Sequence, residues 1–228
     1  RTTRHWFFRL DHYEEQLREW LEGREGWREN VRNFALGVVK GGLPGRSITR
    51  DLTWGVPVPL EEAAGKVLYV WFDAPIGYLS FTREWAEAQG DPEAWRPYWQ
   101  APDTRIVHFL GKDNIIFHAV IWPAMLMAHG EYQLPAEIPA NEYLNFAGEK
   151  FSKSRGVGVW VDEILALYPA DRVRYYLAAI APEGKDANFS WEEFVQRNND
   201  ELSDVVGNLG HRVLTFTGKY YDGAVPPG

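Results

Sequence analysis

Two lysines and an arginine stand close together in the stretch GEKFSKSRG, which spans Gly148 to Gly156. Lys150, Lys153 and Arg155 concentrate positive charge in a chain whose formal net charge is -8. Ammonium groups on a glycine-flanked loop can close over a phosphoryl or pyrophosphate group and stabilise the negative charge of a transition state. The same pattern also fits an exposed basic loop or a phosphorylation site. The chain contains neither a Walker-type lysine loop nor a GxGxxG motif, so a phosphate grip here would be of a different kind.

A second group of candidate residues follows the apolar segment TRIVHFL. Asn114, His118 and Trp122 recur at intervals of four, which places them along one stripe of the helix predicted from about residue 114 to 129. Asp113 at the start of this helix can cap it, or accept a hydrogen bond from a ligand ammonium or hydroxyl. Core packing explains the same stripe without a ligand, with a buried tryptophan and a buried histidine.

A third group lies in VWFDAPIGY, directly after another apolar run. Small Ala74 and rigid Pro75 would let a ligand approach the backbone, and Trp71 and Tyr78 would form aromatic walls. A strand end followed by turn residues explains this segment equally well.

The elements that position these groups are predicted from periodicity. Continuous apolar runs predict buried strands at 66–73 and 104–110, and EYLNF predicts a third strand at 142–146. Helices are predicted at 11–23, 27–36, 79–90 and 114–129. This alternation indicates a parallel α/β sheet, whose ligands lie beyond the carboxyl ends of the strands. Beyond residue 156 the chain is predicted to be mostly helical, and the capping box SWEE (190–193) opens a long helix to about residue 217.

Composition excludes several classes of protein. The chain has no cysteine, which rules out a disulfide framework and a cysteine zinc site and favours a reducing compartment, for which we predict the cytoplasm. No apolar run is long enough to cross a bilayer, so no membrane partner is expected. A pI near 5.3 argues against a uniformly basic nucleic-acid binder. Because the chain begins at Arg1 rather than at a methionine, we expect a piece of a longer protein.

Taken together, the motifs resemble those of one enzyme family. KFSKS is similar to the Lys-Met-Ser-Lys-Ser signature of class I aminoacyl-tRNA synthetases, with Phe151 in place of the methionine. YVWFDAPIGY, LGKDNIIFHAVIWPAML and NNDELSDVVGNLGHRVLTFT resemble segments of the methionyl-tRNA synthetase family. TRDLTWGVPVPL resembles the archaeal and eukaryotic-like branch of that family. The resemblance covers nearly the whole chain.

The resemblance implies an α/β fold: the second half of a class I Rossmann-like parallel sheet, a mostly helical stem-contact segment and the start of a helical bundle. The implied segments are 1–57 (the end of a connective insertion and a crossing segment), 58–140 (the second half of the nucleotide fold), 141–197 (the lysine-serine loop and stem-contact segment) and 198–228 (the first helix of an anticodon-binding domain).

The resemblance also implies roles for individual residues. Those expected to line a methionine pocket are Trp71, Ala74, Pro75, Tyr78, Asn114, His118 and Trp122, although Asn114 departs from the isoleucine of many bacterial members. Those expected near ATP are Gly111, Lys112, Lys150, Ser152, Lys153 and, at the rim, Arg50. Lys150, Lys153 and Asp113 are the implied catalytic residues, with Lys153 acting mainly on the transition state.

The implied reaction has two steps and the partners methionine, ATP and tRNA(Met). Methionine is activated by ATP to methionyl-adenylate and is then transferred to the tRNA. Mg²⁺ would accompany the ATP, while no metal-ligating residue and no zinc site are expected in this chain.

Departures from the family pattern leave alternatives open. The His-Ile-Gly-His signature and the cysteine zinc knuckle are absent from the sequence, so we expect that this polypeptide alone does not form the adenylate. One alternative is a class I synthetase for isoleucine, valine or leucine, against which Trp71, Tyr78, His118 and Trp122 together argue. Another is a non-catalytic module that binds nucleotide or RNA and derives from the family.

Overall fold

The computed structural model describes residues 2–225 of the 228-residue chain. Its contacts divide the chain into two compact units, Arg1–Asn141 and Glu142–Gly228. This division falls one residue from the expected boundary between 140 and 141, and the finer division into four segments stays a prediction. Residue 1 of the first segment and residues 226–228 of the last lie outside the described residues.

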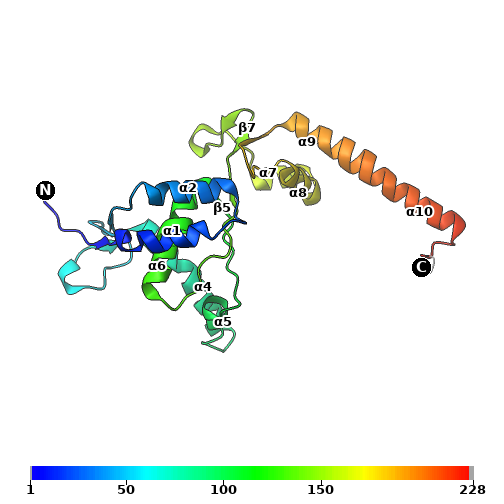
Figure 1. Ribbon diagram of the computed structural model, residues 1–228. Helices are drawn as coiled ribbons and strands as arrows, with labels where there is room; N and C mark the ends of the chain where they lie inside the picture. Colours follow the sequence, from blue (N-terminus) through cyan, green and yellow to red (C-terminus); the bar gives the residue numbers. More distant parts are fainter. Residues whose placement is uncertain (1, 226–228) are drawn as a thin grey trace. The chain divides into compact units, whose positions relative to one another are not determined.

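Helices are the main regular elements of the first unit and supply most of its buried core. They are η1 (Leu10–Tyr13), α1 (Glu14–Glu22), α2 (Glu29–Lys40), η2 (Glu61–Ala63), α3 (Val70–Asp73), α4 (Ile76–Ala88), α5 (Arg96–Gln100), η3 (Lys112–Asn114), the π-helix η4 (Phe117–Ile121) and α6 (Trp122–His129). Helices α1 and α2 pack side by side, with Leu17, Leu21 and Val31 fully buried (Figure 1). The four helices predicted in this unit are therefore confirmed, although α2 extends to Lys40.

The strands of the first unit are short and form separate pairs. They are β1 (Phe7–Phe8), β2 (Arg46–Ser47), β3 (Thr49–Arg50), β4 (Val67–Leu68), β5 (Leu110–Gly111) and β6 (Ala140–Asn141). The pairs β1–β2 and β3–β4 are antiparallel, whereas β5 and β6 are parallel. The α/β class with a small parallel element is confirmed, consistent with part of a Rossmann-like region.

The predicted strand at 66–73 is wrong beyond Leu68. Residues Val70–Asp73 form the one-turn helix α3, in which the amides of Phe72 and Asp73 both donate to the carbonyl of Tyr69. An apolar run cannot by itself distinguish a buried strand from a helical turn. Here Val70 and Trp71 are largely exposed, so the run does not mark burial on both faces of a sheet.

The predicted strand at 104–110 is confirmed only from about Ile106 onward. Leu110 and Gly111 form a ladder, preceded by a bridge between Val107 and Glu137, and the amide of His108 donates to the carbonyl of Glu137 at 3.0 Å. Phe109 is 82% exposed, so alternate residues of this run lack the burial that the prediction assumed.

Side chains just before and within the first turn of α2 anchor the segment that pairs with β5. Trp27 donates through Nε1 to the carbonyl of Ala136 at 2.7 Å, and Asn30 donates through Nδ2 to that of Ala140 at 3.3 Å. These bonds satisfy main-chain acceptors around β6 and hold it against the helical layer. The carboxyl end of β5 is thereby fixed where η3 begins.

The second unit combines a three-stranded sheet with helices. Its elements are β7 (Leu144–Phe146), β8 (Glu149–Lys150), η5 (Lys153–Arg155), α7 (Val161–Leu167), α8 (Ala170–Ala179), β9 (Ala187–Phe189), α9 (Trp191–Arg197), the π-helix η6 (Asn198–Gly207) and α10 (Asn208–Tyr220). Strand β7 lies between antiparallel β8 and parallel β9. The predicted third strand thus exists, but it belongs to this separate sheet and does not continue the β5–β6 pair.

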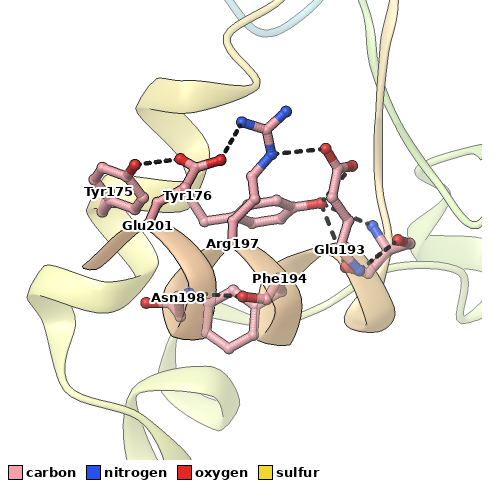
Figure 2. A network of polar contacts seen from close by, with 8 residues as sticks. Tyr175, Tyr176, Glu193, Phe194, Arg197, Asn198 and Glu201 are labelled. Atoms are coloured by element: carbon pink, nitrogen blue, oxygen red, sulfur yellow. Dashed lines mark hydrogen bonds and ion pairs between the residues drawn. The ribbon is translucent and has the colours of Figure 1, made fainter. Parts of the chain in front are cut away.

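A network of polar contacts ties α8 to the long C-terminal helix, in which α9, η6 and α10 follow one another without a break (Figures 1 and 2). The predicted capping box is half confirmed, since Ser190 accepts the amide hydrogen of Glu193 at 3.2 Å. The amide of Ser190 itself donates to the hydroxyl of Tyr176 at 3.3 Å, so a tyrosine takes the place of the reciprocal glutamate. Arg197 lies between Glu193 and Glu201.

Candidate functional site

A tyrosine and a histidine form the best-defined polar pair of the first unit. The Tyr78 hydroxyl of α4 lies 2.9 Å from Nε2 of His118 in η4, and Nδ1 of His118 lies 3.0 Å from the carbonyl oxygen of Asn114. A carbonyl only accepts, so Nδ1 carries a hydrogen. Burial lowers the pKa of His118, which favours the neutral ring. Nε2 is then an acceptor, and the Tyr78 hydroxyl donates to it.

His108, which the sequence pattern did not single out, completes an aromatic triangle with this pair. Its ring centroid lies 5.1 Å from that of Tyr78 and 5.2 Å from that of His118. Burial, with the neighbouring His118, lowers the pKa of His108 to about 4. Its Nε2 is buried and has no hydrogen-bond partner within residues 2–225. The sequence feature that could have indicated His108 is a histidine within the apolar run TRIVHFL.

The aromatic and turn residues of the third predicted group lie around helices α3 and α4. Trp71 stacks on Phe117 of η4, with ring centroids 4.9 Å apart. Ala74 is exposed at the end of α3, and buried Pro75 precedes the first residue of α4. Tyr78 follows in the first turn of α4 and contacts His118, so the structure brings the two aromatic residues of this group to neighbouring residues of η4.

The predicted stripe of Asn114, His118 and Trp122 is divided between two environments. The π-helix η4 carries His118, whose ring lies against those of Tyr78 and His108. Trp122 is buried edge-to-face against Trp99 in a core cluster with Leu79. Its Nε1 has no hydrogen-bond partner among the described residues. Asn114 contributes its carbonyl oxygen to His118.

The end of β5 carries the residues predicted to face nucleotide. Gly111 ends the strand and is exposed. Lys112 and Asp113 follow in η3, the single turn that ends at Asn114. Asp113 lies inside this turn, where Gly111 takes the capping position. Arg50 is tethered elsewhere in this unit: its guanidinium lies 3.8 Å over the Tyr69 ring and donates to the carbonyl of Thr49 at 2.7 Å.

The lysine-serine loop of the second unit is a tight hairpin with a built-in turn. Ser152 and Val157 exchange two main-chain hydrogen bonds, of 2.8 and 3.0 Å. The residues between them form η5, and Gly156 closes the turn with φ of 66°, a left-handed conformation that suits glycine. The hydroxyls of Ser152 and Ser154 lie 3.3 Å apart. The loop is thus an ordered frame for its lysines.

Both signature lysines stand over aromatic rings. Nζ of Lys150 lies 4.7 Å from the centroid of Tyr143, and Nζ of Lys153 lies 5.8 Å from that of Trp160. Neither lysine forms an ion pair with any residue in the range 2–225. Arg155, by contrast, pairs with Glu149 at 3.2 Å. Two ammonium groups without carboxylate partners can accept a phosphate as a new partner.

Phe151, which replaces the methionine of the signature, packs against the backbone of Gly158. Its ring packs on Phe146 of β7 at 5.9 Å. A Cβ built on Gly158 would lie 2.7 Å from Cδ1 of Phe151, and Gly158 has φ of 151°. Only glycine leaves this space and tolerates this backbone conformation. The loop is therefore packed onto the sheet at a position that requires Gly158.

Residues 2–225 contain neither a metal-binding cluster nor a membrane-spanning helix. No group of three or more histidine, cysteine, aspartate or glutamate side chains there could hold a metal ion. Of the helices in that range, none combines the length and the apolar character that a membrane span requires.

Comparison with protein families gives one match that covers most of the chain. Residues 1–214 match the family described as tRNA synthetases class I (M). The methionine–tRNA ligase of Salinibacter ruber is 53% identical over 99% of this chain and 33% of its own length. That of Thermococcus kodakarensis is 51% identical over 97% of this chain and 32% of its own. The chain therefore spans about a third of the length of the curated relatives that it matches.

Solved structures give the same result. The crystal structure of Mycobacterium tuberculosis methionyl-tRNA synthetase bound by methionyl-adenylate matches with a TM-score of 0.79 and 36% identity, over 97% of this chain and 42% of that one. Its free form matches with a TM-score of 0.77 and 35% identity, over 98% of this chain and 42% of that one.

Proposed function

The chain belongs to the tRNA synthetases class I (M) family, and from this membership we propose that it forms part of a methionine–tRNA ligase. In the proposed reaction the carboxylate of methionine attacks the α-phosphate of ATP, which gives methionyl-adenylate and pyrophosphate. The methionyl group then passes to the terminal ribose of tRNA(Met). The partners of the complete enzyme would be methionine, ATP and tRNA.

The first unit would supply the residues that recognise the amino acid. Trp71, Tyr78 and His118 would contact the methionine side chain, with Ala74, Pro75 and Asn114 beside them and Trp122 supporting the wall from the core. A neutral histidine that accepts from a tyrosine hydroxyl presents no net charge to an uncharged thioether. Asp113 would accept from the substrate, next to Gly111 and Lys112.

The second unit would supply the phosphate grip. Lys150 and Lys153 would bind the ATP phosphates, with Lys153 stabilising the charge that develops on the pyrophosphate leaving group, and Ser152 would stand beside them. Arg50 is the weakest of the assigned residues because its guanidinium already bonds to main-chain oxygens of its own strand region. Mg²⁺ bound to the ATP phosphates would share this charge, and the enzyme would act in the cytoplasm.

The observation that carries the choice of methionine is the 2.9 Å contact between Tyr78 and His118 in a neutral, half-buried setting. The test is ATP–pyrophosphate exchange driven by methionine, leucine, valine or isoleucine. It is measured with this chain alone and with the chain joined to the remaining regions of its relatives. We expect methionine-dependent exchange in the joined protein and none in the chain alone. Preferential exchange with leucine, valine or isoleucine would contradict the proposal. Robust exchange by the chain alone would contradict the expectation that this polypeptide does not form the adenylate by itself.

A further inference from the structure

The long side chain of Lys153 needs a restraint that leaves its charge available to phosphate. Lysine has three rotatable donors on a flexible stem, and restraining this stem costs conformational entropy. A carboxylate partner would restrain it, but would also neutralise the charge that a phosphate needs. In the described part of the chain Lys153 has no such partner, and its ammonium instead lies over the Trp160 ring.

A tryptophan face is suited to hold an ammonium group that must later bind phosphate. The ring attracts the cation through its quadrupole when the cation lies within about 6 Å of the centroid. The contact at 5.8 Å meets this condition, and Trp160 is 46% exposed, so the attraction is weak and reversible. Charge-assisted hydrogen bonds to phosphate are stronger, and the ring leaves the three N–H donors unused. The lysine is therefore oriented without being neutralised.

The backbone around Trp160 fixes the ring relative to the loop. Trp160 directly precedes α7, and its carbonyl accepts the amide hydrogen of Ile164 at 3.0 Å. Ile164 is buried in the core of the second unit. The Ser152–Val157 hairpin and the seating of Phe151 against Gly158 hold the other partner. Lysine and ring thus belong to two ordered elements joined by a short connection.

We propose that Trp160 is a positioning residue for amino-acid activation. Its ring holds the Lys153 ammonium in place without a carboxylate partner until phosphate binds. The inference rests on the proposed function of Lys153. Because Lys153 would act mainly on the transition state, loss of the ring should lower the rate constant and leave the binding of ATP almost unchanged.

The test is a double-mutant cycle in the complete ligase that contains this segment, with methionine-dependent pyrophosphate exchange as the readout. We expect Trp160→Leu to lower kcat about threefold to tenfold, with KM for ATP changed less than about twofold. Trp160→Phe, which keeps an aromatic face, should recover most of the rate. In the Lys153→Ala background, Trp160→Leu should cost nothing further. Val161→Ala, one residue along and 71% exposed, is the matched control and should resemble the parent.

The outcomes separate the inference from the function on which it rests. Equal losses from Trp160→Leu in both backgrounds would mean a merely structural role and would overturn the inference alone. A fully active Trp160→Leu enzyme would also overturn it. A fully active Lys153→Ala enzyme would contradict the proposed function of the loop and the inference together.

A second measurement on this chain examines the contact without catalysis. After ¹³C-dimethylation of lysines, the methyl protons of Lys153, assigned with Lys153→Arg, should resonate upfield of those of Lys185 because of the tryptophan ring current. Lys185 has no aromatic contact among the described residues. Trp160→Leu should remove this difference, and added pyrophosphate should reduce it. A Lys153 resonance that does not respond to Trp160→Leu would overturn the contact and the inference.

Discussion

The hydroxyl of Tyr78 donates to Nε2 of His118 across 2.9 Å. This bond joins helices α4 and η4, and the two bonded residues lie 40 positions apart in the chain. The other ring nitrogen of His118 donates to the carbonyl of Asn114, so both nitrogens of a buried histidine are satisfied in its neutral form. The orientation of the tyrosine hydroxyl is therefore set before any ligand arrives. The proposed recognition of methionine depends on this preorganisation.

The Tyr78→Phe variant tests this bond. Removal of the hydroxyl leaves Nε2 of His118 without a donor, and we expect a loss of about 1 kcal/mol in the free energy of unfolding. In the complete ligase we expect KM for methionine to rise about fivefold to tenfold, because the polar wall of the pocket loses its orientation. Chemical denaturation and pyrophosphate exchange measure the two effects.

A matched control for this variant is Tyr98→Phe. Tyr98 of α5 is 55% exposed, and its ring lies edge-on against Trp85. Its hydroxyl makes no hydrogen bond within the described residues, so the substitution should change neither stability nor KM. If Tyr98→Phe and Tyr78→Phe behave alike, the Tyr78–His118 bond does not have the role assigned to it.

Stability should depend on pH through His108. Its pKa falls from 6.5 in the unfolded chain to about 4 in the folded one, chiefly through burial. Between these values the unfolded chain binds more protons, so the free energy of unfolding falls with falling pH by up to about 1.4 kcal/mol per pH unit. This stabilising contribution is complete above pH 6.5 and is lost as the pH approaches 4.

The His108→Phe variant isolates this contribution because it keeps an aromatic ring against Tyr78 and His118 but cannot titrate. We expect a flatter profile of unfolding free energy between pH 6.5 and 4, measured by urea denaturation, than in the parent chain. Carboxylates titrate in both proteins, and His118 also titrates in both, with its own pKa lowered by burial. Parallel profiles would show that His108 is not held neutral by the fold.

The sequence predicted helices better than strands, for a physical reason. Helices such as α1 carry their signals locally: an apolar stripe that includes buried Leu17 and Leu21, and a glycine directly after the last turn, here Gly23. Whether an apolar run is a strand depends on a partner elsewhere in the chain. VLYVWF reads as a buried strand, but only Val67 and Leu68 find a partner, in β3, and the remaining residues form a helical turn.

The candidate site shows a similar limit. The loop lysines could be predicted because their charge pattern is local, whereas the rings beneath them, Tyr143 and Trp160, could not be assigned from spacing. His108 was missed because its contacts with Tyr78 and His118 arise from packing between elements. The burial of Trp122 in a core cluster with Trp99 likewise depends on residues distant in the sequence.

The seating of Phe151 should depend on Gly158. In Gly158→Ala the new Cβ meets the Phe151 ring and the backbone stays at φ of 151°, so we expect a local cost of about 1–3 kcal/mol. Hydrogen exchange at the amides of Ser152 and Val157, which close the hairpin, should accelerate about tenfold or more. Gly184→Ala is the control, because that site is open and has an ordinary φ. Unchanged exchange in Gly158→Ala would contradict this account of the loop.

Among the residues in Figure 2, we expect Tyr176 to contribute most to the free energy of unfolding. The hydroxyl of Tyr176, a residue with no exposed surface, accepts the amide hydrogen of Ser190 and lies 3.2 Å from Glu193. Tyr176→Phe leaves this amide at the start of α9 without a partner, so we expect a loss of about 1–3 kcal/mol in the free energy of unfolding.

Arg197 pairs with two carboxylates in the same network, but its loss should cost less. Its pairs with Glu193 and Glu201 are partly exposed and one helical turn apart, a class of ion pair that contributes little and is screened by salt. Arg197→Met keeps the aliphatic stem and should destabilise the chain less than Tyr176→Phe, with a difference from the parent that shrinks in high salt. Thermal or urea unfolding of both variants at two salt concentrations measures this order. The reverse order would mean that the ion pairs within the long helix, rather than the hydrogen bonds of Tyr176, contribute most to the stability of this network.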